Sequence, residues 1–136
     1  MCEVVVIDTN VLLSALISKK TDTATVKILN KVLGGLILPL YNVEILKEYD
    51  EVLHREKFKI EDEKIALMIS AIKKYGVEVC PKKSTEDMID DSDRIFLDTA
   101  NYIDNAYLVT GNLKHFPKSA FIVSPSEMIH IIESSE

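Results

Sequence analysis

Side chains able to hold a divalent cation are spread along this sequence, and most of them lie beside short apolar runs. The set contains carboxylates, hydroxyls and amides: Asp8, Thr9, Asn10, Glu44, Asp93, Thr110 and Asn112. Oxygen ligands of these kinds suit Mg²⁺ or Mn²⁺, and three carboxylates brought together repel one another unless a cation lies between them. Histidine and cysteine are absent from these positions, which argues against zinc. The residue types therefore predict a Mg²⁺ or Mn²⁺ site if the fold gathers them.

The element that must position Asp8 is a strand. Four consecutive β-branched residues at 4–7 are typical of a strand buried on both faces, in the middle of a parallel sheet. The run stops at Asp8, and apolar residues then recur at helical spacing between Val11 and Leu16. Asp8 would therefore lie where a strand passes into a helix. An alternative role at such a place is that of a helix N-cap.

Short apolar runs alternate with helical patterns along the rest of the chain. Further strands are expected at 36–39, 77–80, 107–110 and 121–123, the first of them ended by Pro39. A helix from Asn42 to about Glu56 would carry Glu44 in its first turn, with Glu48 facing solvent. This alternation predicts an α/β fold of three layers, with a central parallel sheet of about five strands and helices on both faces.

The carboxyl ends of the strands are where open α/β sheets bind ligands. If the first and fourth strands are neighbours at the switch point, Asp8, Glu44, Asp93 and the segment 110–112 would meet in one crevice. Asp93 begins a helix that also carries Asp98, which would be either an auxiliary ligand or a solvated surface acid. Two neighbouring acids are alternatives to Asp93 as the ligand, or simply favour the start of the helix: Asp90 and Asp91.

The overall composition limits the class of protein. With 136 residues the chain suits one layered domain, and we expect 1–136 to form it. The formal net charge of −6 argues against nucleic acid as a partner, unless clustered acids hold a cation where phosphate must bind. No apolar run approaches the roughly 20 residues of a membrane span, and no leader segment precedes the first strand. These features predict a cytoplasmic protein without membrane contact, in which Cys2 and Cys80 are buried.

Four motifs carry a resemblance to a known family. They are Val-Ile-Asp8-Thr9-Asn10-Val-Leu, then Glu44-Ile-Leu-Lys-Glu-Tyr, then Asp93-Arg-Ile-Phe-Leu-Asp-Thr-Ala, then Leu-Val-Thr110-Gly111-Asn112. In this order and at this spacing, the chain resembles the PIN-domain family over nearly its full length. Within the family, the Thr-Gly-Asn form of the fourth motif is similar to that of toxin components from prokaryotic toxin–antitoxin pairs.

The resemblance implies metal-dependent cleavage of single-stranded RNA, in which a metal-activated water attacks a phosphodiester in line. It assigns the acidic metal ligands to Asp8, Glu44 and Asp93. A hydroxyl of Thr9 or Thr110 would lie near the metal or its water. Asn112 departs from the pattern, because many relatives carry aspartate there. Asparagine offers a carbonyl oxygen but no charge, which implies weaker metal binding.

The resemblance also implies partners, namely a cognate antitoxin protein and a second copy of the chain in a homodimer. Lys114 and His115 directly follow the fourth motif and are weaker candidates for RNA contact. One alternative is a catalytically weak RNA-binding module that keeps the fold. A receiver-type phospho-acceptor domain is disfavoured because no second acid adjoins Asp8, and a haloacid-dehalogenase-type enzyme is disfavoured because Asn10 replaces its second aspartate.

Overall fold

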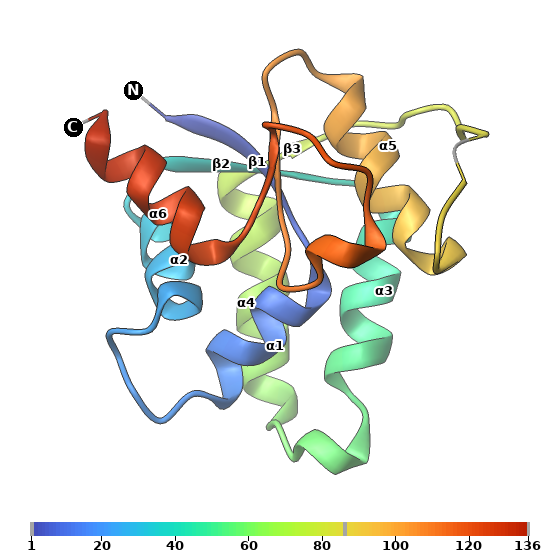
Figure 1. Cartoon of the computed structure of the whole chain (residues 1–136). Helices are drawn as coiled ribbons and strands as arrows, with labels where there is room; N and C mark the ends of the chain where they lie inside the picture. Colours follow the sequence, from blue (N-terminus) through green and yellow to red (C-terminus); the bar gives the residue numbers. More distant parts are fainter. Residues whose placement is uncertain (1, 86, 136) are drawn as a thin grey trace.

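A computed structural model describes residues 2–85 and 87–135 of the chain (Figure 1). The strands are β1 (Glu3–Ile7), β2 (Ile37–Tyr41), β3 (Val77–Glu78), β4 (Tyr107–Val109) and β5 (Ile122–Val123). The helices are α1 (Thr9–Ile17), α2 (Ala24–Leu33), α3 (Val43–Leu53), α4 (Asp62–Tyr75), α5 (Arg94–Tyr102) and α6 (Pro125–Ser134). Three short 3₁₀ helices complete the list: η1 (Glu56–Phe58), η2 (Asp91–Asp93) and η3 (Leu113–His115).

Strand β1 lies at the centre of a parallel sheet whose order is β3-β2-β1-β4-β5. Val5 pairs with Pro39 of β2 on one side and with Tyr107 of β4 on the other. The last three side chains of β1 are wholly buried, as the β-branched run predicted. The chain crosses back over the sheet after β3, so the switch point lies between β1 and β4. The condition under which the motifs could meet, that the first and fourth strands are neighbours, is therefore met.

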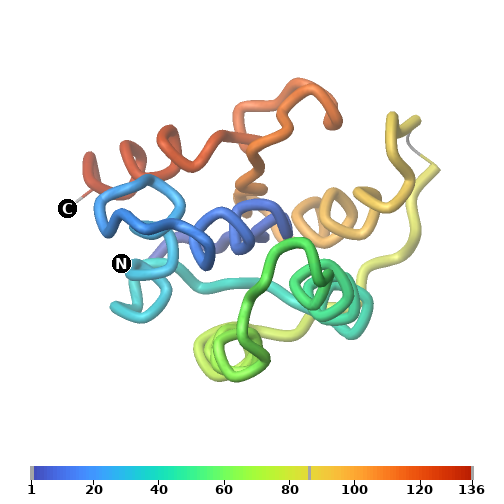
Figure 2. Tube along the Cα trace, turned by 90° about the horizontal axis from the view of Figure 1, so that it is seen from below, coloured from blue at the N-terminus to red at the C-terminus, as the bar shows by residue number. Residues whose placement is uncertain are grey.

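Helices cover both faces of the sheet, which confirms the three-layer α/β fold. Helices α2 and α6 pack against each other on one side of the strands, and α5 packs on β1, β2 and β4 from the other side (Figure 2). The largest wholly buried side chains include Leu12, Ile28, Ile45, Ile72, Phe96, Leu108 and Met128. Among the described residues, no helix combines the length and the apolar character needed to cross a lipid bilayer.

The prediction that Pro39 ends its strand is wrong, because β2 continues to Tyr41. Proline lacks an N–H, but pairing between β2 and β3 begins only at Leu40, so no ladder hydrogen bond is lost. Gly76 adjoins this part of the strand, and a Cβ there would lie 2.3 Å from the Pro39 carbonyl oxygen. The close approach of the two backbones therefore requires glycine at position 76.

Two smaller predictions are also wrong. Helix α3 ends at Leu53 rather than near Glu56, because the chain there turns into the 3₁₀ helix η1. Cys2 and Cys80 are exposed rather than buried. Cys2 directly precedes β1 and Cys80 lies two residues after β3, so neither belongs to a strand of the sheet.

Candidate functional site

Asp8 lies at the carboxyl end of β1, next to β4, and only 4% of its surface is exposed. It occupies the N-cap position of α1, but its side chain makes no capping hydrogen bond. Instead, the Thr110 hydroxyl donates to Asp8 Oδ2 at 2.7 Å, and the same hydroxyl oxygen accepts from the Asn112 N–H at 2.9 Å. The first and fourth motifs are thus joined by a short chain of hydrogen bonds, and the N-cap role does not account for the Asp8 carboxylate.

Burial raises the pKa of Asp8 from 3.8 to about 6. The hydrogen bond from Thr110 opposes this rise, and the negative charge of Asp93 adds to it. A carboxylate that loses water and faces a second carboxylate gains strongly from a nearby cation, because the cation offsets both costs.

Asp93 is the last residue of η2 and is brought beside the site by the start of α5. Its side chain is 14% exposed, and Asp93 Oδ2 lies 3.1 Å from Nδ1 of His115, which belongs to η3 directly after the fourth motif. Burial raises the pKa of Asp93, whereas the hydrogen bond with His115 lowers it. His115 therefore links the third and fourth motifs and orients the Asp93 carboxylate.

Helix α3 is fixed against this site by two buried polar contacts. The Tyr49 hydroxyl donates to the carbonyl oxygen of Ile7, immediately before Asp8, and burial followed by the Asp8 charge raises the pKa of Tyr49. Asn42 caps α3 by accepting from the Ile45 N–H at 3.0 Å, and its Nδ2 donates to Thr99 Oγ1 on α5 at 2.9 Å. These bonds hold the start of α3 against the middle of α5, and the middle of α3 against the carboxyl end of β1.

Two glutamates of α3 lie at different depths. Glu44 is exposed in the first turn, where it lines a hollow with Pro81 and Lys83. Glu48, one turn further along, is half-buried, so the prediction that it faces solvent is wrong. Its position three residues after the buried Ile45 was the sequence signal for partial burial.

The charge around Glu48 connects it with the acidic site. Burial raises the pKa of Glu48, the negative charge of Glu51 raises it further, and Asp93 and Asp90 add smaller contributions in the same direction. The charge of Asp93 thus reaches Glu48, although Glu51, which raises the pKa of Glu48, and Arg55, which lowers it, have larger effects. Sequence reasoning missed this residue as a functional candidate because the motif comparison favoured Glu44, at the start of the helix.

Of the two polar side chains that follow Asp8, one has a hydrogen-bond partner in the described ranges of the chain and the other does not. Asn10 Oδ1 accepts from the Gly111 N–H at 3.4 Å, which ties the first motif to the fourth a second time. The Thr9 hydroxyl is buried but has no hydrogen-bond partner among the residues that the structure describes. Buried polar atoms without a partner are rare and point to a water or ion at that place. Together with the carboxylates, this unengaged oxygen fits a site for a hard divalent cation.

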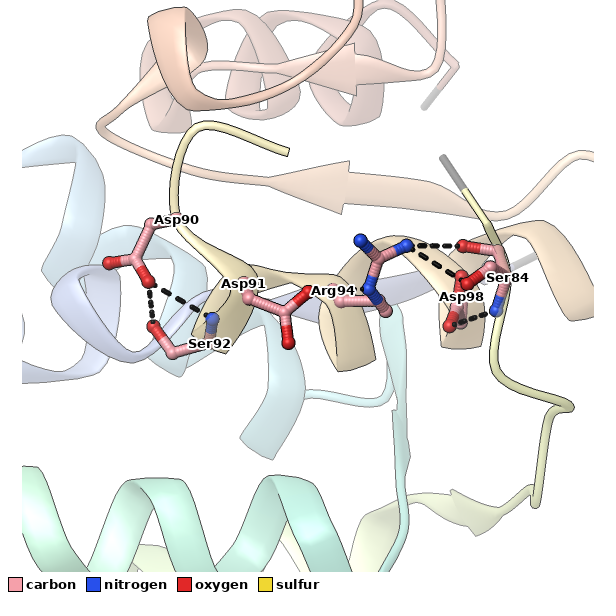
Figure 3. Close-up of polar contacts among 6 residues, drawn as sticks. All are labelled: Ser84, Asp90, Asp91, Ser92, Arg94 and Asp98. Carbon is pink, nitrogen blue, oxygen red and sulfur yellow. Dashed lines mark hydrogen bonds and ion pairs between the residues drawn. The ribbon is translucent and has the colours of Figure 1, made fainter. Parts of the chain in front are cut away.

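Asp98 is not the solvated surface acid that was one of its two predicted roles, since only 6% of its surface is exposed. Its Oδ2 accepts from the Ser84 N–H at 3.0 Å, while Nη1 of Arg94 donates to the Ser84 carbonyl and hydroxyl oxygens at 3.0 and 3.1 Å (Figure 3). Arg94 also binds Asp91 at 2.7 Å. One face of α5 thus fastens the loop after β3, and this fixes the turn that leads to Asp93.

Asp90 and Asp91, the alternatives to Asp93, are both exposed and have structural partners. Asp90 Oδ1 accepts from the N–H and the hydroxyl of Ser92, and these hydrogen bonds lower the pKa of Asp90. Asp91 is held by Arg94, as Figure 3 shows. These contacts shape the start of α5, in agreement with the second role predicted for the two acids.

The remaining candidates lie at the outer edge of the site. Asn112 is exposed, and it is its backbone N–H that contacts Thr110. Lys114 is exposed beside it, and His115 is engaged with Asp93. Within the described ranges 2–85 and 87–135, no three acidic, histidine or cysteine side chains are gathered closely enough to hold a metal ion. The fold brings Asp8, Asp93 and the fourth motif together and leaves Glu44 at the periphery.

The arrangement of strands and motifs agrees with a comparison of the sequence with known families. The PIN domain family matches residues 4–114, a range that includes β1 apart from its first residue, β2 to β4 and every acid discussed above. No curated protein matches the sequence significantly. Members of this family are generally nucleases that depend on divalent metals. The chain belongs to the PIN domain family and has its nuclease-type fold.

Proposed function

We propose that this protein is an endoribonuclease that cleaves single-stranded RNA and uses Mg²⁺ or Mn²⁺ as its cofactor. The observation that supports the proposal most directly is that Asp93 lies close enough to Asp8, at the carboxyl edge of the sheet, for its charge to raise the pKa of Asp8. Asp8 is buried, its pKa is raised to about 6, and part of that rise comes from the charge of Asp93. Two carboxylates that destabilise each other in this way are suited to share a divalent cation.

Asp8 and Asp93 would be the first two ligands, and a glutamate of α3 would be the third. The sequence motif favours Glu44, whereas burial and the charge of Asp93 favour Glu48. Asn112 would contribute its carbonyl oxygen, and Thr9 its unengaged hydroxyl. When bound, the cation supplies an activated water and positive charge beside the phosphate.

Several side chains of the site would act by positioning. The Thr110 hydroxyl donates a hydrogen bond to Asp8 Oδ2, so it holds one carboxylate oxygen and leaves the other for a ligand. His115 orients Asp93 in the same manner. Tyr49 and Asn42 hold α3 at the correct distance from β1 and α5. These contacts preorganise the acids on rigid elements, which lowers the cost of forming the site.

Purified protein and a fluorescent, unstructured RNA test the proposal. Cleavage should require Mn²⁺ or Mg²⁺ and stop in EDTA. Asp8→Asn, which keeps the acceptor for Thr110, should lower the rate by at least about a hundredfold. Asp22→Asn, which removes one exposed acid from the loop between α1 and α2, is the matched control and should leave the rate unchanged. Cleavage that persists in EDTA, or in Asp8→Asn, would overturn the assignment.

The biological role that we propose is that of the toxin in a toxin–antitoxin pair, acting as a cytoplasmic homodimer. The Thr-Gly-Asn form of the fourth motif supports this branch of the family. A neighbouring short reading frame should then encode a DNA-binding antitoxin. Its product should co-purify with this protein and inhibit cleavage of RNA. A partner that binds without inhibiting would contradict the toxin role while leaving the nuclease proposal intact.

Asn112 favours a second candidate, a catalytically weak RNA-binding module. An uncharged residue at this position weakens the attraction for a divalent cation. Such a module would bind RNA equally well in Mn²⁺ and in EDTA and would not cleave it. The same cleavage assay, combined with an RNA-binding titration in both conditions, separates the two candidates.

A further inference from the structure

The segment that follows β4 is positively charged in an otherwise acidic protein. The chain has 22 acidic residues against 16 Lys and Arg, yet no Asp or Glu occurs between Asp104 and Glu127. Lys114 and Lys118 lie in this segment and are exposed. Within the described part of the chain, neither ammonium group has a hydrogen bond or an ion pair. Both charges are therefore available to an anionic ligand.

Two hollows adjoin each other along this segment and lead to the acidic site. One is lined by Leu113, Lys114, Pro117 and Lys118, among others. The other is lined by Leu113 and Lys114 together with residues of the fourth motif and His115. Leu113 and Lys114 line both hollows, so the two are neighbours, and together we call them the β4–β5 groove. Its inner end is His115, in contact with Asp93.

The chemistry of the groove suits a single-stranded nucleic acid. Two lysines four residues apart provide separate contacts for phosphates, while Leu113, which is 42% exposed, and Pro117 provide apolar surface for a base. Double-stranded RNA is recognised over about 16 base pairs of a regular helix, which needs a wide surface rather than a short groove. The remainder of the protein repels RNA because acidic residues outnumber Lys and Arg there.

We infer that the β4–β5 groove binds the segment of the RNA strand next to the cleaved phosphodiester, with Lys114 and Lys118 on its phosphates. The inference rests on the proposed ribonuclease function and adds the path of the substrate to it. The groove determines how tightly RNA binds, and the acids at the switch point carry the chemistry. His115 is hydrogen-bonded to Asp93 and so forms part of the acidic site, and we do not include it among the RNA contacts.

The test compares two double variants with the same change in charge. The double variant Lys114→Ala/Lys118→Ala removes both lysine ammonium groups from the groove. Lys73→Ala/Lys74→Ala is the control, because both lysines lie in the last turn of α4, before β3 and away from the carboxyl edge of the sheet. An RNA of about twelve nucleotides serves as the probe. KM and kcat are measured in Mn²⁺, and binding is measured by fluorescence anisotropy in EDTA, where cleavage is not expected.

The groove variant should raise KM and the dissociation constant about tenfold, with kcat changed less than about twofold. Loss of two phosphate contacts should also reduce the slope of log Kd against the logarithm of salt concentration by about 1.4, since each contact with a single strand contributes about 0.7 to that slope. The control should match the parent. If the parent cleaves RNA but both variants bind equally well, the groove inference is wrong and the nuclease proposal stands. If the parent neither binds nor cleaves RNA, both are wrong.

Discussion

Asp8 couples the acidic site to the stability of the protein. Its pKa is 3.8 in ordinary surroundings and about 6 in the folded protein, so between these values the folded state binds more protons than the unfolded state. The free energy of unfolding therefore falls as the pH rises from about 4 to 6 and stays lower above that range. The difference in pKa corresponds to about 3 kcal/mol. Asp8 costs stability at neutral pH when no cation is bound.

Asp8→Asn should therefore stabilise the metal-free protein. In EDTA at pH 7.5, the free energy of unfolding should rise by up to about 3 kcal/mol, because a neutral amide replaces a buried, repelled charge and still accepts from Thr110. At pH 3, below both pKa values, parent and variant should be equally stable. Urea denaturation at the two pH values measures this difference. A variant that is less stable than the parent at pH 7.5 would make Asp8 a structural residue.

The choice between Glu44 and Glu48 is open to a direct comparison. Glu48→Gln and Glu44→Gln remove one charge each from the same helix and keep the size of the side chain. If Glu48 is the third acid, Glu48→Gln should blunt the rise in melting temperature that Mn²⁺ produces, and Glu44→Gln should not. Thermal melting with and without Mn²⁺ measures both. The reverse result would assign the role to Glu44, as the motif suggests, and would leave Glu48 with no part in metal binding.

Asn112→Asp should produce a crossed pattern of stability. Without metal, a further carboxylate near Asp8 and Asp93 adds repulsion and lowers the melting temperature. With Mn²⁺ the same carboxylate strengthens coordination, so the variant should gain more than the parent and cleave RNA faster. Melting in EDTA and in Mn²⁺, alongside cleavage rates, tests this. An unchanged metal response would mean that Asn112 serves only the turn after β4, where its N–H contacts Thr110.

At the scale of elements, the loop after β3 is held to α5 by hydrogen bonds at Ser84. Its N–H donates to Asp98, and its carbonyl oxygen accepts from Arg94. Asp98→Ala would leave a part-buried N–H unpaired and should destabilise the protein by about 1–3 kcal/mol. Asp87→Ala, which removes an exposed acid from the same loop, should change stability by less than about 0.5 kcal/mol. The rise in melting temperature with Mn²⁺ should be the same in both. A smaller rise in Asp98→Ala alone would restore Asp98 as an auxiliary ligand.

Element positions were predictable wherever a local pattern determines them. The β-branched run of β1, the capping residues Asn42 and Ser124, and Pro125 at the first turn of α6 act through neighbours in the sequence. Burial of Asp98 was not predictable, since it depends on Ser84, fourteen residues away in a loop without regular structure. The continuation of β2 through Pro39 depends in the same way on where β3 begins to pair.

For the whole molecule, the order of the strands in the sheet determines whether the separate motifs form one site. Once β1 and β4 are neighbours, Asp8 must lie next to Thr110, and the sequence predicted this meeting. Contacts between individual side chains were harder to predict. His115 was a weaker candidate for RNA contact, and its hydrogen bond with Asp93, which joins η3 to the start of α5, was not foreseen. Periodicity indicates which side of a helix is buried, but not which carboxylate lies opposite a given ring.

Binding of metal should stabilise the entire fold, because an ion that binds only the folded state shifts the folding equilibrium by mass action. Above the dissociation constant, each tenfold increase in Mn²⁺ should add about 1.4 kcal/mol to the free energy of unfolding. A protein with a net charge of −6 also gains from screening by salt, so Mn²⁺ must be compared with NaCl at equal ionic strength. Screening should reach a plateau, whereas specific binding should continue to rise with the logarithm of Mn²⁺. Asp8→Asn should keep the response to NaCl and lose the logarithmic rise. If parent and Asp8→Asn follow the same curve in Mn²⁺, the ion acts on the overall charge and the acids at the switch point do not bind it.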